Sequence, residues 1–156
     1  EKGAWDAMFW MGGLVALATA LAKSGFIAWI AKLIGTAVAA ADMGWVASFV
    51  LISLIYIYSH YCFASVTARI SAMYAAFVAV AAACGVPAML VAITFGCFAN
   101  LPISLTHYGN GCGPVYFGAG YVSQGEWWRN GFIITTINVV IWLTIGMTWW
   151  KFIGLY

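Results

Sequence analysis

Long apolar stretches separated by short polar breaks dominate the chain, and their lengths predict membrane-spanning helices. A helix of about 20 apolar residues crosses the hydrocarbon core of a bilayer. Residues 4–22 meet this length, and Trp5 and Trp10 are candidate anchors at the membrane interface. Residues 25–35 are shorter and carry Lys32, a pattern that favours an interfacial or connecting helix over a second crossing.

Residues 43–64 follow Asp42 and are rich in Ile, Leu and Tyr, so their apolar pattern alone predicts a full span. From Ser65 the pattern changes to small residues at helical spacing, which would let a second helix backbone approach closely. This stripe consists of Ser65, Ala68, Ala72, Ala75 and Ala79.

A break follows at Gly85, Val86 and Pro87. Pro87 can begin the next helix, because the N–H that proline lacks would have no partner there. We expect that helix to run toward Leu101 and to stop at Pro102, since proline cannot continue it.

Residues 102–113 cannot form a regular helix. They contain four residues that break helices or favour turns, namely Pro102, Gly109, Gly111 and Gly113. Pro114 is well placed to start a second, short half-helix. The pattern therefore predicts one helix interrupted by a polar, glycine-rich run.

The last apolar stretch, residues 131–150, gives the clearest span. Residues 123–126 (Ser-Gln-Gly-Glu) are typical of a polar turn. Trp127, Trp128 and Arg129 follow them, a combination typical of a membrane boundary.

Composition supports a membrane protein and excludes several other classes. Only 6% of the 156 residues are charged and 65% are hydrophobic, too few charges to cover a water-soluble domain. The net charge of +2, without a Lys/Arg cluster, argues against a nucleic-acid partner. No Ser/His/Asp set, metal-ligand spacing or CxxC pair is present, so we expect neither an enzyme nor a metal or other cofactor, and we interpret the four cysteines as packing residues.

Two polar clusters interrupt the apolar sequence. The first contains Ser65, Thr67 and Arg69, and the second contains Ser104, Thr106, His107, Tyr108, Gly109, Asn110 and Gly111. Each combines hydroxyls with a break in regular helix, which leaves N–H groups and a positive dipole end that suit a carboxylate. Transporters commonly build substrate sites from such discontinuous helices, so we expect the two clusters to form one anion pocket.

Arg69 is the only charged side chain between Asp42 and Glu126. It could pair with a substrate carboxylate or take the place of a coupling cation. Alternatively, it could snorkel to the interface or pair with an acid elsewhere. His107 could donate to substrate or change protonation, or it could bond a loop carbonyl as a structural residue, and we interpret His60 as structural.

At residues 65–68 (Ser-Val-Thr-Ala) and 101–121 the chain closely resembles the divalent anion/sodium symporter (DASS) family. The nearest match is the branch that exchanges citrate, 2-oxoglutarate, malate and tartrate, whose members carry a very similar Ser-Leu-Thr-His-Tyr-Gly stretch. The similarity spans essentially all 156 residues.

The resemblance implies an all-α polytopic membrane protein that forms the carboxy-terminal part of an inverted-repeat elevator transporter. Residues 1–35 would hold a scaffold-side transmembrane helix and an interfacial arm helix, and residues 43–121 would belong to the transport domain. Within it, 43–84 would be a re-entrant hairpin rather than one span, and 86–121 a broken helix. Residues 130–151 would be the last transmembrane helix.

The resemblance also implies a substrate-binding set of Ser65, Val66, Thr67, Ser104, Leu105, Thr106, His107 and Gly109. Arg69 and His107 would compensate the charge of the substrate. Val66 stands where the family often has Asn, and a sodium ion beside a guanidinium is electrostatically unfavourable. We therefore predict sodium-independent exchange of di- and tricarboxylates.

As partners the resemblance implies the lipid bilayer, an amino-terminal half that completes the site, and a second copy in a homodimer, in a bacterial plasma membrane. The alternatives are a sodium-coupled dicarboxylate symporter of the same family, and a channel or structural membrane subunit.

Overall fold

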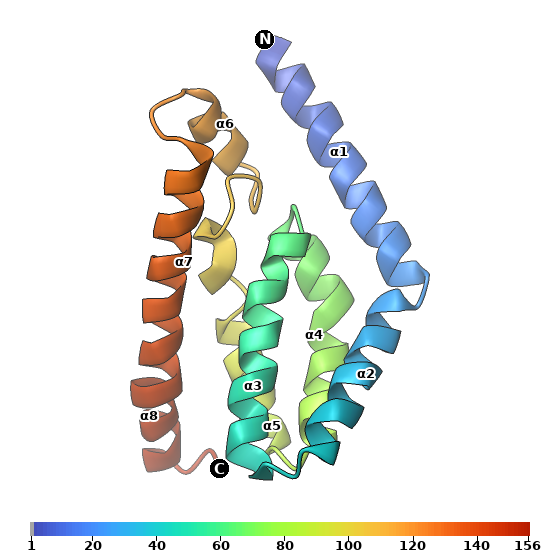
Figure 1. Ribbon diagram of the computed structural model, residues 1–156, viewed down its shortest axis with the longest axis vertical. Helices are drawn as coiled ribbons and strands as arrows, with labels where there is room; N and C mark the ends of the chain where they lie inside the picture. Colours follow the sequence, from blue (N-terminus) through green and yellow to red (C-terminus); the bar gives the residue numbers. More distant parts are fainter. Residues whose placement is uncertain (1) are drawn as a thin grey trace.

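The computed structural model describes residues 2–156, except for the side chains of residues 2–4, 6, 7, 10, 11, 14, 15, 18, 22 and 39. Every element in this range is helical, which confirms the all-α prediction for the described residues. The helices run lengthwise beside one another, with the hairpin of α3 and α4 between α2 and α7 (Figure 1).

Helix α1 (Lys2–Lys23) agrees with the helix predicted over residues 4–22. Trp5 is 60% exposed, and the side chain of Trp10, the other expected anchor, lies outside the described residues. Gly25, with a φ of 76°, joins α1 to α2 (Phe26–Ala40). Helix α2 extends past residue 35 because residues 36–40 contain no helix breaker and are mostly alanine, the best helix former.

Helix α3 (Gly44–Tyr58) and the 3-10 turn η1 (Ser59–Cys62) form one arm of a helical hairpin, and α4 (Val66–Ala83) forms the other. The chain reverses direction at residues 63–65, which we call the hairpin tip (Figure 1). Gly44–Cys62 and Val66–Ala83 are each long and apolar enough to cross a membrane. Because the chain reverses at the tip, the apolar stretch 43–64 forms the first arm of this hairpin.

The small-residue stripe is not the most buried face of α4 in the described structure, and its close approach to a second helix stays a prediction. Ala75 and Ala79 are exposed, and α4 instead buries the face that contains Arg69, Met73, Phe77 and Ala81. Larger side chains remove more apolar surface from contact with solvent, so burial favours their face over the alanines. Close backbone approach occurs at the neighbouring face, where a Cβ on Gly35 of α2 would lie 3.0 Å from Val80.

The predicted helix interruption is present. Helix α5 (Ala88–Cys97) is followed by the 3-10 turn η2 (Leu101–Ser104), then by a non-helical loop at residues 105–112, and then by α6 (Gly113–Gly118), with Pro114 in its first turn. The break begins earlier than expected, at Cys97 rather than at Leu101. In a continuous helix the N–H of residue 102 would donate to the carbonyl of Phe98, but proline has no N–H. The last helical hydrogen bond is therefore missing four residues before Pro102, and α5 ends at Cys97.

Residues 123–126 were predicted as a turn and instead begin a helix, α7 (Gln124–Ile141). Ser123 is the N-cap, its Oγ accepts the N–H of Glu126, and a carboxylate oxygen of Glu126 accepts the N–H of Ser123 at 2.9 Å. This capping box satisfies two N–H groups that would otherwise lack a partner. The helix continues through a π-helical segment (Trp142–Gly146) and α8 (Met147–Phe152), so Gln124–Phe152 is a third candidate span among the described residues.

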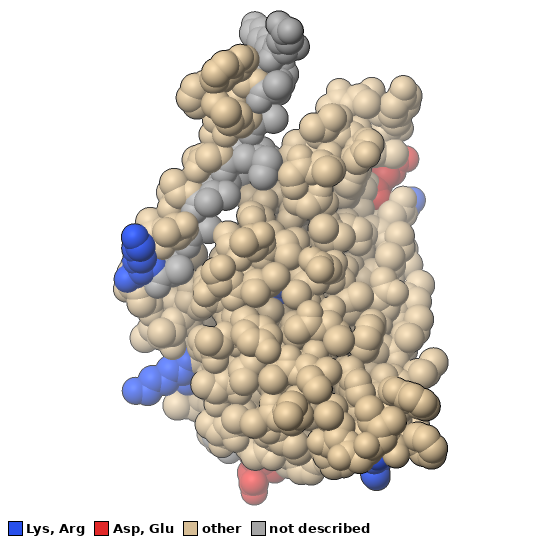
Figure 2. Space-filling model, turned by 180° about the vertical axis from the view of Figure 1, so that it is seen from behind, with Lys and Arg blue, Asp and Glu red and all other residues tan. Residues whose placement is uncertain are grey.

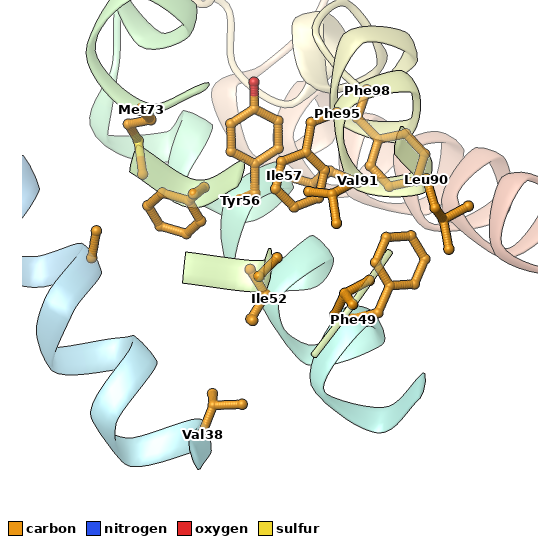
Figure 3. Close-up of a cluster of buried hydrophobic side chains, with 14 of the residues drawn as sticks. Val38, Phe49, Ile52, Tyr56, Ile57, Met73, Leu90, Val91, Phe95 and Phe98 are labelled. Atoms are coloured by element: carbon orange, nitrogen blue, oxygen red, sulfur yellow. The ribbon is translucent and has the colours of Figure 1, made fainter. Parts of the chain in front are cut away.

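An aromatic and aliphatic core joins the hairpin to α5 (Figure 3). At its centre the ring of Tyr56 stacks on that of Phe95, with centroids 4.6 Å apart and planes 10° apart. Both side chains, like Phe77 opposite them, are fully or almost fully buried. Figure 2 shows that, from behind, Lys, Arg, Asp and Glu lie mainly at the margins of the molecule. A broad surface without charged side chains lies between them, which fits contact with lipid.

Candidate functional site

The hairpin tip presents the amino end of α4. Ser65 has extended backbone and its Oγ accepts the N–H of Ala68 at 3.4 Å, which makes Ser65 the N-cap. The first N–H groups of a helix have no partner within it, so those of Val66 and Thr67 lie at the positive end of the helix dipole. Thr67 is exposed and Ser65 and Val66 are half-buried. This geometry suits an anionic group.

Arg69, one turn below the tip, is completely buried. Its Nη1 donates to the carbonyl oxygen of Tyr56 at 2.9 Å, and its Nη2 donates to the carbonyl oxygens of Ala99 at 2.7 Å and Phe98 at 3.3 Å. The guanidinium carbon also lies 4.6 Å from the centroid of the Tyr56 ring. Arg69 therefore links α4, the last turn of α3 and the end of α5.

These contacts explain why a cation is stable here. The carbonyls of Phe98 and Ala99 follow the last turn of α5, and that of Tyr56 lies in the last turn of α3, so Arg69 sits where two helices present their negative ends. It also supplies the carbonyl of Phe98 with the donor that Pro102 lacks. Arg69 does not snorkel to the surface, and among the described residues it bonds backbone rather than an acid. Its Nε has no hydrogen-bond partner there, so the guanidinium keeps donor capacity.

The loop after η2 is buried at its start. Leu105 and Thr106 are fully buried, and Ser104 is half-buried with its Oγ 3.5 Å from Oγ1 of Thr135 on α7. The side chain of Leu105 is enclosed and its N–H bonds the carbonyl of Pro102 at 3.0 Å. Both the side chain and the N–H of Leu105 are thus unavailable to a ligand.

Gly109 lies directly against the hairpin. A Cβ at this position would lie 2.6 Å from Nε2 of His60 and 3.1 Å from Oγ1 of Thr106, so only glycine fits without displacing a buried group. His60 and Thr106 are both fully buried. The interpretation of His60 as a structural residue agrees with this packing against the loop.

Several buried polar atoms on α3 and α4 retain unused hydrogen-bonding capacity. Among the described residues, Oγ of Ser53, the hydroxyl of Tyr56 and Nε of Arg69 have no hydrogen-bond partner. Buried polar groups in folded proteins are nearly always paired with protein, water or ligand. This part of the molecule is therefore suited to hold polar groups at membrane depth.

Asn110 changes the expectation that the loop offers free N–H groups at the second half-helix. Its Oδ1 accepts the N–H groups of Cys112 at 2.8 Å and Gly113 at 2.7 Å, and its Nδ2 donates to the carbonyl of Ile103. The amino end of α6 is thus capped from within the chain. Asn is a common capping residue, but Asn followed by Gly is also typical of a turn, so the sequence alone does not identify Asn110 as a cap.

His107 lies in an aromatic cluster that sequence reasoning missed. Its ring stacks on Phe117, with centroids 4.3 Å apart and planes 28° apart, and its Nδ1 accepts the indole N–H of Trp128 at 3.3 Å. Tyr108 packs edge-on against both His107 and Trp128, and donates its hydroxyl to the carbonyl of Tyr61 at 2.8 Å. Trp128 was interpreted only as a boundary residue, and no local pattern pairs it with His107.

The hairpin and the loop thus meet through η1. His60 and Tyr61 contact Gly109 and Tyr108, whereas no hydrogen bond joins Ser65 or Thr67 to the described part of the loop. Tyr108 packs against His107 and Trp128 and bonds the carbonyl of Tyr61. Tyr116 is 68% and Tyr121 90% exposed.

Comparison with known proteins finds a matching family model and relatives that are membrane proteins or transporters by name. The family model described as the sodium:sulfate symporter transmembrane region matches residues 1–156. A spinach protein (Spinacia oleracea) named chloroplastic dicarboxylate transporter 1 is 45% identical over 100% of this chain and 27% of its own length. Chloroplastic dicarboxylate transporter 2.1 of Arabidopsis thaliana is 40% identical over 100% of this chain and 28% of its own length.

A bacterial relative is also similar. Inner membrane protein YbhI of Escherichia coli (strain K12) is 36% identical over 97% of this chain and 31% of its own length. The chain thus spans less than a third of the length of each of these relatives.

Proposed function

The chain belongs to the sodium:sulfate symporter family, the family that the sequence resembles, and we propose that a full-length transporter containing it exchanges di- and tricarboxylates across a membrane. The observation that carries this proposal is the buried cation Arg69, which lies one turn from the capped amino end of α4 and bonds the carbonyls at the start of the helix interruption. The relatives named as dicarboxylate transporters, which match over the whole chain, support the substrate class.

In this proposal the substrate binds between the hairpin tip and the loop. One carboxylate accepts hydrogen bonds from the N–H groups of Val66 and Thr67 and from the hydroxyls of Ser65 and Thr67. Ser104, Thr106 and His107 donate to the substrate from the loop side. Gly109 lets the loop approach His60, and Leu105 contributes its backbone alone.

The positive charge in the site comes from Arg69. Its bonds are to carbonyls that carry only partial negative charge, so the unit charge of the guanidinium is not neutralised by an acid among the described residues. A unit positive charge that no acid neutralises attracts a nearby carboxylate and repels a nearby sodium ion, which supports sodium-independent exchange.

The rest of the proposal concerns the whole protein. We propose that α1 and α2 form the scaffold side and its arm helix, that the hairpin and the broken helix move as parts of a transport domain in an elevator cycle, and that an amino-terminal half completes the site. Two copies would form a homodimer. A bacterial plasma membrane is the proposed location, with an inner membrane relative in support and the chloroplastic relatives as the alternative.

The experiment that tests this proposal is counterflow in proteoliposomes with a full-length transporter that contains these residues. We expect internal malate, succinate, 2-oxoglutarate or citrate to accelerate uptake of the labelled acid, with saturation and with equal rates in sodium and potassium buffers. Uptake that requires a sodium gradient would support instead the sodium-coupled symporter, an alternative that the description of the family itself favours. Flux that neither saturates nor responds to internal substrate would refute both.

A further inference from the structure

We propose that Trp128 is a positioning residue that holds His107 as a neutral hydrogen-bond donor toward the substrate; this inference rests on the proposed function and assigns a role within the same site. The indole N–H of Trp128, on the second turn of α7, donates to Nδ1 of His107 at 3.3 Å. The two residues lie 21 positions apart and meet only because the loop folds back against α7.

The chemistry of the two rings fixes the proton. Indole is a donor only, so Nδ1 of His107 must carry a lone pair to accept from it. A neutral imidazole has one N–H, which therefore stands on Nε2, and a protonated imidazole has no lone pair to offer. Among the described residues, the hydrogen bond of the His107 ring is the one at Nδ1, so the N–H on Nε2 is available to a ligand.

The surrounding rings hold the imidazole in place. Phe117 of α6 stacks on it, and Tyr108 packs edge-on with centroids 5.1 Å apart. Tyr108 is itself fixed by its bond to the carbonyl of Tyr61, and Tyr61 packs against Trp128 at 5.6 Å. Rotation of His107 would therefore break contacts with α6, the loop and α7, and among the described residues Trp128 is the neighbour that hydrogen-bonds the ring and so selects the protonation pattern.

This assignment separates two roles that the sequence gave jointly to Arg69 and His107. Arg69 is the permanent cation, because its guanidinium stays charged. His107 is a neutral donor whose direction is set by Trp128. A neutral donor binds a carboxylate without adding a second buried charge that would have to be stabilised when the site is empty.

Trp127 provides a matched control. It adjoins Trp128, and its ring packs edge-on against Phe117 with centroids 6.0 Å apart, but no hydrogen bond joins it to His107. If the tryptophans merely pack at a membrane boundary, phenylalanine at either position should have similar effects. If Trp128 acts through its N–H, only Trp128→Phe should affect substrate binding.

The experiment compares Trp128→Phe, Trp127→Phe, His107→Gln and the double variant Trp128→Phe/His107→Gln in a full-length transporter reconstituted in proteoliposomes. A neutral hydrogen bond is worth about 1 kcal/mol, so we expect Trp128→Phe to raise the KM for dicarboxylate exchange about fivefold with kcat within twofold. Trp127→Phe should change KM less than twofold. In the His107→Gln background, Trp128→Phe should add no further loss.

Equal effects of the two tryptophan variants, or an undiminished effect of Trp128→Phe in the His107→Gln background, would overturn the inference. A second measurement does not depend on transport. In histidine-labelled protein, nitrogen NMR should show His107, identified by its absence in His107→Gln, with its proton on Nε2. A proton on Nδ1 in the unaltered protein would refute the role of Trp128. The expected NMR result without dicarboxylate exchange would instead refute the proposed function alone.

Discussion

Gly131 of α7 gives the sharpest test of how the loop is supported. A Cβ at this position would overlap the carbonyl oxygen of Ser104, and would lie 2.9 Å from the carbonyl carbon of Ser104 and 3.0 Å from Cα of Leu105. All three are backbone atoms of η2 and the loop, so no side chain can rotate to make room. Gly131→Ala therefore forces η2 away from α7.

The required movement can be worked out from these distances. Ordinary van der Waals contact begins at 3.4 Å, so the carbonyl carbon must move by at least 0.5 Å (3.4 minus 2.9) and the overlapped oxygen by more. Overpacking of this kind costs about 1 to 3 kcal/mol. Alanine recovers up to about 1 kcal/mol through its helix propensity, so we expect a net loss of stability of up to about 2 kcal/mol.

Function should be more sensitive than stability, because η2 carries Ser104 and leads into Thr106, two residues that we propose bind the substrate. Displacement of a binding group by about 1 Å can cost two orders of magnitude in rate. We expect exchange by Gly131→Ala in the full-length transporter to fall at least tenfold, measured as counterflow in proteoliposomes, together with a lower thermal unfolding temperature in detergent.

Gly125→Ala is the matched control. Gly125 lies in the same helix and a Cβ there would meet no atom within 4 Å. It should keep normal exchange and equal or slightly higher stability. If Gly131→Ala behaves like Gly125→Ala, α7 does not support η2 in the way described.

Three further predictions concern the full-length transporter. Arg69→Lys keeps the charge but cannot span the carbonyls of Tyr56 and Ala99, so stability should fall by about 2 to 3 kcal/mol and exchange at least tenfold; unchanged exchange would show that charge alone suffices. Gly109→Ala should cost about 1 to 3 kcal/mol, because the added methyl would press on the buried ring of His60, and a normal unfolding temperature would contradict this packing. Ser123→Ala removes the N-cap and should lower stability by about 1 kcal/mol without a change in KM for the exchanged acid; a KM that rises would mean that the cap also shapes the site.

The sequence predicts the larger features of this fold because they depend on local signals. Long apolar runs give the helices, and Pro102 with its neighbouring glycines gives the interruption. Ser123 and Glu126 also carried a readable signal, the Ser-x-x-Glu spacing of a capping box, which we interpreted as a turn.

Other features depend on contacts between distant segments, and local patterns cannot reveal them. Arg69 bonds Phe98 and Ala99, about 30 positions away, and only the packed hairpin brings them together. The stripe of alanines on α4 has the spacing of a packing face, but the choice of buried face depends on which neighbours are available. Trp128 meets His107 for the same reason.

The bond between Arg69 and the carbonyl of Phe98 has a consequence for the energetics of ligand capture. A helix interrupted by proline alone leaves one carbonyl without a hydrogen-bond donor, and its backbone could adopt several conformations. Here Arg69 of the hairpin donates a hydrogen bond to that carbonyl, so the helix interruption is already formed without a bound solute. In the proposed exchange, binding free energy need not be consumed in unwinding the chain, so the affinity for the acid can stay matched to rapid loading and release on both sides of the membrane.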